Sequence, residues 1–528
     1  MALSRYLRYV IRFIIEYGTF IVILAIGVVI YRIVFLEAVE QYLERSLWIF
    51  RYVWLGNGEI SLFDYTLTYQ FEGYSDYSFY YVHWGQNMLD GVMPYTSDFG
   101  YREIGWYVNE NGLYIFPPLT AIFYAIGIML PVDNWGIGFL LAAFSYLTVF
   151  PVYGLGRELS NNRYVGEAAA LTYLLSPCVL YHSIFLWMNP APFVFFFFMG
   201  FYMLVRGNKL TGVLLIVVSA LFKQTAWFFA FPLVTYLLIR GKSESHKEID
   251  QPETEIEDEE EEEEPSATII DRINATIDIS GFLKYTIIVL VFAAAILFPF
   301  LISQPHMFDH WRLAMGGFPL EPPYTDPPGY GTPITLPYLP VMAGLPLVAE
   351  IMNNIVSYGF LLYFGVILFA GVMLLEPRDN SEIKVYLRRL LFLTFLLMMW
   401  VYLTGPRGVF KYYFVLMAPF FSIFSSSKMV TSKDEHVSFS FSMLWLPLAL
   451  SLVILIPPRE IYLFGIILIS LGYAMGQKVG LFWRTLTAPI RWVIKQLRNR
   501  TESYFQGFVV VKRRVEYAIY PERFEESR

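Results

Sequence analysis

YSDYSFYYVHWGQNMLDGVMPYTSDFGYREIGWYVNENGLYIFPP, residues 74–118, is the stretch on which the interpretation of the whole chain depends. It is a long, polar, aromatic-rich segment that lies between two strongly apolar regions. Its ionisable side chains include Asp76, His83, Asp90, Asp98 and Glu103. A polar segment in such surroundings predicts a large loop at a membrane surface, and the apolar regions predict a scaffold that holds a site against this loop.

The composition is that of a membrane protein. Of 528 residues, 56% are hydrophobic, 19% are aromatic and only 16% are charged, against roughly 25% charged residues in soluble domains. Apolar runs of about 16 to 24 residues recur between short polar loops, which predicts a polytopic membrane protein. The acidic run 253–264 supplies much of the net charge of −7, so the sequence shows no basic footprint for nucleic acid. The single cysteine, Cys178, excludes an intrachain disulfide and a cysteine-based metal site.

Basic residues predict the sidedness. Arg5, Arg8 and Arg12 precede the first apolar run, so the N-terminus is expected to be cytoplasmic. Placing the later basic loops inside as well requires that 117–130 does not cross the membrane, and we expect a re-entrant or interfacial helix there. The prediction is an all-α fold with about twelve transmembrane helices and both termini cytoplasmic. The expected runs are Phe13–Leu36, Trp135–Gly154, Val165–Phe185, Pro190–Val205, Leu210–Phe222, Ala226–Ile239, Phe282–Ile302, Asn354–Leu375, Leu390–Thr404, Tyr412–Ser425, Val437–Ile456 and Ile461–Gly476.

The domain organisation follows from the same runs. We expect one transmembrane domain over 1–476 and a basic cytoplasmic tail over 477–528. Within the transmembrane domain we expect a first external loop with interfacial helices, an acidic cytoplasmic linker, and a second external loop rich in Pro and Tyr. These segments are 37–134, 243–281 and 303–353.

Carboxylates of the first external loop are candidate catalytic groups. Asp76 precedes a helical-looking stretch, 77–89, so it is either a helix N-cap or a general base that takes a proton from an acceptor hydroxyl. Asp64 is the runner-up for the general base. Asp90 precedes Gly91, and this pair predicts a turn.

Lys223 is the most unusual residue of the apolar regions, because it joins two short apolar runs. An ionisable group at that depth predicts function, and its natural partner is a lipid-linked phosphate. The alternative is a lysine that extends to the membrane surface. Arg407, Lys411 and Arg312 are expected on the same external face, although each alone is more often an interface anchor.

Other sites have weaker support. His306, Asp309 and His310 lie close together in the sequence but do not complete the ligand set that a zinc site requires, so we expect no metal there. The sequence has no P-loop, no Gly-rich dinucleotide motif and no nucleophile elbow. Nucleotide chemistry on the cytoplasmic side therefore has no support.

The first external loop resembles that of the GT-C glycosyltransferases, most of all the polyprenyl-phosphate-mannose-dependent and related archaeal and bacterial branch. The resemblance also covers Lys223, although Gln224 stands where the family often has proline, and the segment KYYFVLMAPF that begins at Lys411. This chain departs from the family at two places. Trp187–Pro190, WMNP, stands where relatives often have an acidic or Gln-containing motif. Ile115 and Phe116 stand before the Pro-Pro pair, where the family usually has a glutamate. The matching loop residues are Asp76, Tyr80, Tyr81, Leu89–Gly91, Pro94, Tyr95 and Phe116–Leu119.

The resemblance implies a GT-C fold, Asp76 as the general base, and a polyprenyl- or dolichyl-phosphate sugar as the donor. We therefore expect an inverting hexosyltransferase, such as a mannosyltransferase, on the outer face of the cell membrane. The acceptor would be a hydroxyl of a lipid-, glycan- or protein-linked group, and neither a cofactor nor a divalent metal is expected. The expected donor phosphate-binding residues are Lys223, Arg407, Lys411 and Arg312. The expected substrate-binding residues are Tyr80, Tyr81, His83, Asn189 and Tyr412.

Two other classes remain open at this point. A lipid or solute transporter, such as a flippase, would favour internal repeats and polar groups at the membrane midplane. The sequence shows no clear repeat, and its polar groups gather on one face. A structural scaffold would fit the composition, but this hypothesis does not explain Lys223 or the large external loops.

Overall fold

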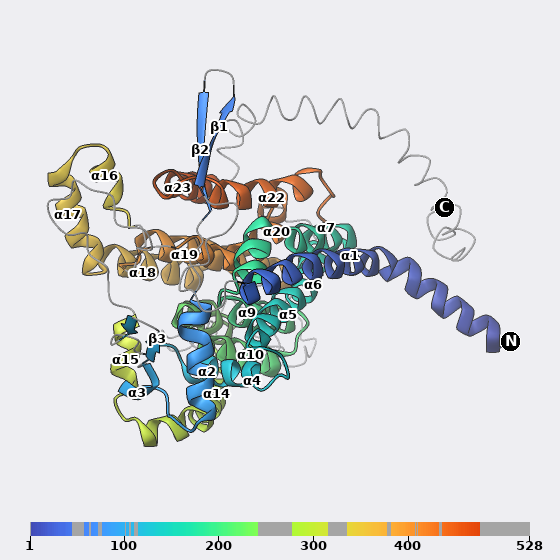
Figure 1. Cartoon of the computed structure of the whole chain (residues 1–528). Helices are drawn as coiled ribbons and strands as arrows, with labels where there is room; N and C mark the ends of the chain where they lie inside the picture. The colour runs from blue at the N-terminus through green and yellow to red at the C-terminus, as the bar shows by residue number, and fades with distance from the viewer. Residues whose placement is uncertain are drawn as a thin grey trace, which may run out of the picture. The chain divides into compact units, whose positions relative to one another are not determined.

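The helices of this chain dominate the computed structural model (Figure 1). The acidic run 253–264 and the basic tail 477–528 lie outside the described residues, and so does most of the linker 243–281. The described residues are 2–44, 57–62, 65–71, 76–100, 102–104, 107–109, 114–240, 277–314, 335–376, 378, 382–406, 408, 410–431 and 436–475.

Among these residues, five helical segments are long and apolar enough to cross a membrane, and a bent pair makes a possible sixth. The bent pair is α17 (Pro346–Ser357) and α18 (Phe360–Leu375). The five segments are α1 (Ala2–Glu44), α5 (Gly136–Leu147) with α6 (Val149–Ser160), α7 (Arg163–Leu174) with α8 (Pro177–Val179) and η2 (Leu180–Phe185), α14 (Ile279–Ser303), and α19 (Ile383–Thr404).

The remaining apolar helices are shorter. A helix such as α10, with 14 residues, reaches about 21 Å, whereas the hydrocarbon core is about 30 Å thick. The number of about twelve spans therefore stays a prediction. These helices are α4 (Pro118–Ile128), α9 (Ala191–Val205), α10 (Lys209–Phe222), η3 (Gln224–Phe229) with α11 (Ala230–Leu238), η4 (Lys411–Leu416) with α20 (Met417–Ile423), α22 (Ser442–Leu455) and α23 (Arg459–Met475).

Helix α4 is the segment that we expected to lie in the membrane without crossing it. It has 11 residues, so it reaches only about 16 Å, roughly half of the hydrocarbon thickness. It packs against α2 (Val82–Leu89), α5 and α10. Its length and its packing agree with a helix that supports the first external loop from below.

The expected all-α architecture is wrong for the first external loop. Two antiparallel hairpins lie there: β1 (Asn57–Leu62) pairs with β2 (Tyr65–Gln70), and β3 (Arg102–Ile104) pairs with β4 (Tyr107–Asn109). The β2 sequence, YTLTYQ, is rich in Tyr and Thr, which fit a pleated strand better than a helix. The loop also contains η1 (Tyr77–Tyr81), α2 and α3 (Ser97–Gly100).

Two expected helix boundaries change. Helix α1 continues without a break to Glu44, so it does not end at Leu36. The described residues of the predicted second external loop, 303–353, include helices: α15 (Met307–Ala314), α16 (Tyr338–Met342) and the first eight residues of α17. The helix expected from Asn354 therefore begins at Pro346 and bends before Gly359. The turn predicted after α2 is confirmed, since Asp90 is the C-cap and Gly91 has φ +80°.

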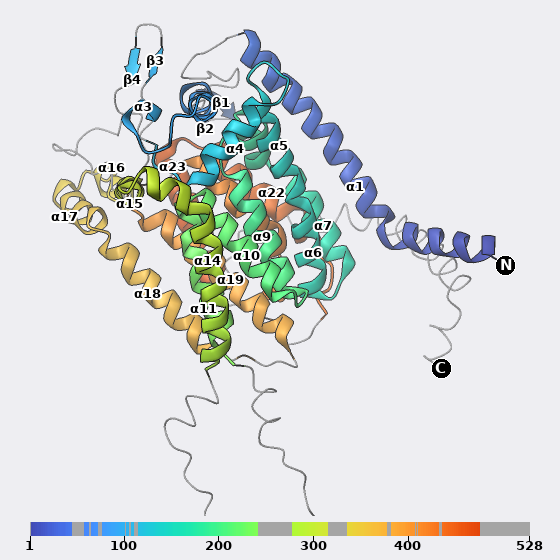
Figure 2. The ribbon, with the colours of Figure 1, turned by 90° about the horizontal axis from the view of Figure 1, so that it is seen from below.

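Ion pairs join several loops that we expected on the cytoplasmic side. Glu158, at the end of α6, accepts hydrogen bonds from Arg206 at 2.9 Å and from Lys384 at 3.0 Å. Arg206 follows α9, and Lys384 begins α19, so three loops meet at one carboxylate. Figure 2 shows α15, α16 and α17 together at one end of α14 and α18. The assignment of either end to a side of the membrane stays a prediction.

Candidate functional site

Lys223 lies where the helix α10 stops. Its backbone is extended, with φ −151° and ψ 138°, and the chain continues as the 3-10 helix η3. The predicted junction of two short apolar segments is therefore a true break in the helix. The lysine is only 7% exposed, so its side chain is enclosed by the protein and does not extend to the surface.

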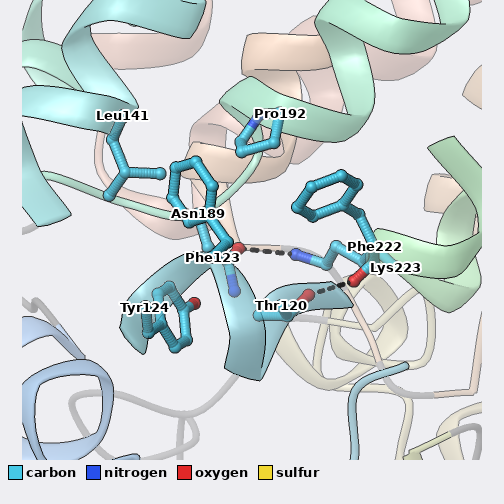
Figure 3. Close-up of a pocket in the computed structure, with 8 residues that line it drawn as sticks. All are labelled: Thr120, Phe123, Tyr124, Leu141, Asn189, Pro192, Phe222 and Lys223. Atoms are coloured by element: carbon cyan, nitrogen blue, oxygen red, sulfur yellow. Dashed lines mark hydrogen bonds between the residues drawn. The ribbon is translucent and has the colours of Figure 1, made fainter. Parts of the chain in front are cut away.

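The Lys223 ammonium is surrounded by aromatic rings. Its Nζ donates a hydrogen bond to Asn189 Oδ1 at 2.9 Å (Figure 3). The ring centroids lie 4.9 to 5.8 Å from Nζ, within the range at which aromatic faces attract cations. We call these rings the aromatic cage; they belong to Phe116, Phe193, Tyr412 and Tyr413.

The cage brings together motifs that are far apart in the sequence. Gln224 Nε2 donates a hydrogen bond to the Ile115 carbonyl, and Thr120 Oγ1 donates one to the Phe222 carbonyl at 2.5 Å. The end of the first external loop is thus attached to the break at Lys223 on both sides. These two hydrogen bonds hold the Phe-Pro-Pro segment 116–118 against residues 222–224.

A cavity opens beside the ammonium (Figure 3). Its empty volume is about 240 Å³ when the open solvent at its mouth is counted, and the enclosed part has room for about one water molecule. Its walls come from α4, α5, α9 and the helix break at Lys223. Lys223 contributes a basic group to the lining, and Asn189 contributes an amide. The lining residues are Thr120, Phe123, Tyr124, Leu141, Asn189, Pro192, Phe222 and Lys223.

Asp76 is the N-terminal flanking residue of η1. Its carbonyl accepts a hydrogen bond from the Tyr80 amide at 2.8 Å, but its side chain makes no capping hydrogen bond. The expected alternative role as a side-chain N-cap is therefore wrong. The helix that follows Asp76 reaches the cavity wall through Tyr81, whose ring stacks on that of the cavity-lining Tyr124 at 4.6 Å.

Tyr77 fixes the position of its neighbour Asp76. Its hydroxyl donates to the Asn134 carbonyl at 2.7 Å and accepts from the Gly138 amide at 3.0 Å. Its ring lies 4.7 Å from that of Trp187, a fully buried residue two positions before Asn189. Gly138 leaves room for this indole, because a Cβ there would lie 2.4 Å from the Trp187 ring.

The other expected substrate-binding residues fall into two groups. Asn189 and Tyr412 contact Lys223, so the structure brings them to the cavity or its cage. Tyr80, Tyr81 and His83 lie on η1 and α2: Tyr81 stacks on Tyr124 at 4.6 Å, Tyr80 stacks on Trp84 at 5.0 Å, and His83 is half-buried. A role of these three in binding substrate stays a prediction.

Lys411 does not extend toward the cavity. It is completely buried, and its Nζ donates hydrogen bonds to the carbonyls of Leu455 and Pro457. These carbonyls lie at the C-terminal end of α22, where cations stabilise a helix. Lys411 therefore makes a structural contact in place of the expected contact with phosphate. The sequence could not indicate this contact, because it depends on the direction in which η4 presents the Lys411 side chain.

The other expected cations and acids are elsewhere. Arg312 lies on the exposed side of α15. Arg407 and Asp64 lie outside the described residues. His306 Nδ1 is 3.6 Å from Asp309 Oδ2, and both side chains are exposed. In the described parts of the chain, no three His, Cys, Asp or Glu side chains are grouped so that they could hold a metal ion. The expectation that no cofactor is needed stays a prediction.

Sequence reasoning missed the support that Tyr95 gives to the cage. Trp311 Nε1 donates to the Tyr95 hydroxyl at 3.0 Å, and this hydroxyl donates to the Phe116 carbonyl at 2.8 Å. Tyr95 has φ +73°, an unusual conformation for a tyrosine. Burial raises the pKa of the Tyr95 hydroxyl far above its usual value, so it stays a neutral donor. The contact joins α15 to the first external loop.

Fold and site together define a helical membrane protein with a lysine buried at a helix break beside a cavity. No protein-family model matches the chain, and no curated protein matches it. Among solved structures, the chain is similar to the apo oligosaccharyltransferase of Archaeoglobus fulgidus, with a TM-score of 0.34 and 14% identity. The match covers 83% of this chain and 56% of the oligosaccharyltransferase chain. This chain therefore spans little more than half of the length of the oligosaccharyltransferase. A similarity of this size does not establish a shared activity.

Tyr77→Phe should destabilise the protein. The substitution removes the hydroxyl that pairs with the Asn134 carbonyl and the Gly138 amide. The Gly138 amide is buried, and a buried group left unpaired costs about 1–3 kcal/mol. We expect a lower melting temperature of the purified protein, measured by thermal shift in detergent. Tyr358→Phe, at an exposed tyrosine, is the control and should not change it. An unchanged melting temperature for Tyr77→Phe would contradict the contact.

Proposed function

We propose that this protein is a GT-C-type glycosyltransferase that moves a hexose from a polyprenyl- or dolichyl-phosphate donor to an acceptor hydroxyl at the outer face of the cell membrane. The acceptor is a lipid-, glycan- or protein-linked group. The observation that carries this proposal is the Lys223 ammonium, which is buried at a helix break and lines a cavity. A fixed cation at the membrane level is suited to the phosphate of a lipid-linked sugar.

The proposed reaction is a single displacement. The acceptor hydroxyl gives its proton to the Asp76 carboxylate, and its oxygen forms a bond to the anomeric carbon of the sugar. The bond between this carbon and the phosphate oxygen breaks, and its electron pair leaves with the polyprenyl phosphate. The configuration at the anomeric carbon is therefore inverted.

Lys223 acts on the leaving group. As the sugar departs, the phosphate gains negative charge, and an ammonium already in place stabilises that charge without first having to reorganise. Asn189 Oδ1 accepts a hydrogen bond from this ammonium, so the amide orients the cation. The aromatic cage stabilises the charge by cation–π attraction.

We assign the activation of the acceptor to Asp76. It precedes η1, whose first residue, Tyr77, is anchored by two backbone hydrogen bonds. The same helix contacts the cavity wall, since Tyr81 stacks on Tyr124. In the proposed reaction the base and the cation are supplied by different elements of the chain.

Lys223→Met should weaken donor binding and slow the chemical step. A charge-assisted hydrogen bond contributes roughly 1.5–3 kcal/mol, which is about ten- to a hundredfold in affinity. The measurements are the affinity for a labelled polyprenyl-phosphate sugar and the single-turnover rate. Lys223→Arg should restore only part of both values, because a planar guanidinium directs its donors differently.

Lys209→Met is the matched control, since Lys209 lies at the other end of the same helix α10. It should keep the wild-type affinity and rate. Wild-type values for a folded Lys223→Met would contradict the proposed phosphate contact. Movement of the labelled lipid across the membrane without sugar transfer would instead identify a transporter.

Asp76→Asn should abolish transfer while leaving donor binding nearly intact. Loss of a general base lowers the rate by about 10²- to 10⁴-fold, and the amide keeps the shape of the carboxylate. Asp98→Asn, at an exposed residue of the same loop, is the control, and Asp64→Asn should have a milder effect. If Asp64→Asn abolished transfer and Asp76→Asn did not, Asp64 would be the general base.

A further inference from the structure

Helix α17 has an unusual position at the end of the second external loop. It forms an angle of 56° with α18 across a break of two residues, and Gly359, at the break, has φ +71°. Figure 2 shows α17 beside α16, at one end of the longer helix α18. The chain therefore changes direction where α18 begins.

One face of α17 is packed against the protein. Ala349, Asn353 and Val356 recur at helical spacing and are buried. The helix contacts α16 and α18. This face fixes the orientation of α17 on the rest of the chain.

A second face is apolar and exposed. It consists of Leu347, Ile351 and Ile355, one on each successive turn, and we call it the apolar stripe. Leu347 is 68% exposed and Ile351 is 53% exposed within the described part of the chain. The third face carries Glu350, Asn354 and Ser357. Three faces with different chemistry are expected of a helix at a boundary between protein, lipid and water.

The neighbouring helix indicates what covers the apolar stripe. Helix α18 is apolar along its length, FLLYFGVILFAGVMLL, and it exposes Phe360, Phe364 and Ile367. Tyr358 lies at the bend and is 73% exposed, and tyrosine is enriched at the membrane–water boundary. The helix that directly follows the apolar stripe thus has an exposed surface suited to lipid chains.

We propose that α17 lies in the membrane interface, with the apolar stripe among lipid chains and the face of Glu350, Asn354 and Ser357 toward water. Interfacial helices of this kind bury their apolar face about 5–10 Å deep. The α17 sequence contains no lysine or arginine, so the interaction is hydrophobic and needs no anionic headgroup. The lipid belongs to the leaflet at the α15–α17 end of the protein. This inference does not depend on the proposed sugar transfer.

The test is spin-label accessibility of the full chain in nanodiscs of phosphatidylcholine. Nitroxides are attached to Leu347→Cys, Ile351→Cys, Glu350→Cys and Asn354→Cys, and collision rates are measured with oxygen and with a water-soluble nickel chelate. Positions 347 and 351 should give a severalfold higher oxygen-to-nickel ratio than 350 and 354. Adding phosphatidylglycerol should change none of the ratios.

The chain supplies the reference positions. Ile367→Cys, on the exposed face of α18, is the lipid reference, and Arg206→Cys, in the loop after α9, is the water reference. The native protein controls for background labelling, because its single cysteine, Cys178, is buried. High nickel accessibility at 347 and 351 would overturn the proposal. Low accessibility to both reagents there would also overturn it and would indicate cover by a second protein copy.

Discussion

The structure depends on one ammonium group that is buried among apolar helices. Removing a lysine from water is costly unless other groups replace its hydration. At Lys223 this replacement comes from the Asn189 carbonyl oxygen and the four rings of the aromatic cage. Each cation–π contact contributes about 0.5–2 kcal/mol, so the cage compensates a substantial part of the desolvation cost. The Lys223 side chain therefore has partners inside the protein and does not extend to the surface.

The same requirement explains the local geometry around the lysine. A continuous helix would not bring side chains from η4, α9 and the first external loop around one nitrogen, whereas the extended backbone of Lys223 does. The hydrogen bonds of Thr120 and Gln224 then attach the loop to the break. Tyr95 links Trp311 of α15 to Phe116. The two loops that we expect to be external are thus connected to the buried lysine through short chains of contacts.

The sequence predicted the helical membrane character, the break between two short helices at Lys223, and the turn at Asp90, because these depend on local composition and spacing. It could not predict the aromatic cage, since Phe116, Phe193 and Tyr413 are ordinary apolar residues until the fold brings them together. It missed the β-hairpins, whose short strands give a weak signal beside long apolar runs. It also misjudged Lys411, because its orientation toward the end of α22 is set by tertiary packing.

The most direct test of the central claim, that Lys223 holds a lipid phosphate, is a cryo-electron microscopy structure of the protein in nanodiscs with a polyprenyl phosphate. The account predicts phosphate density in the cavity lined by Thr120, Asn189 and Lys223. A phosphate oxygen should lie about 2.7–2.9 Å from Lys223 Nζ, the usual length of a charge-assisted hydrogen bond. Phosphate density at another cation, such as Arg312, with Lys223 contacting only Asn189 and its cage, would contradict the account.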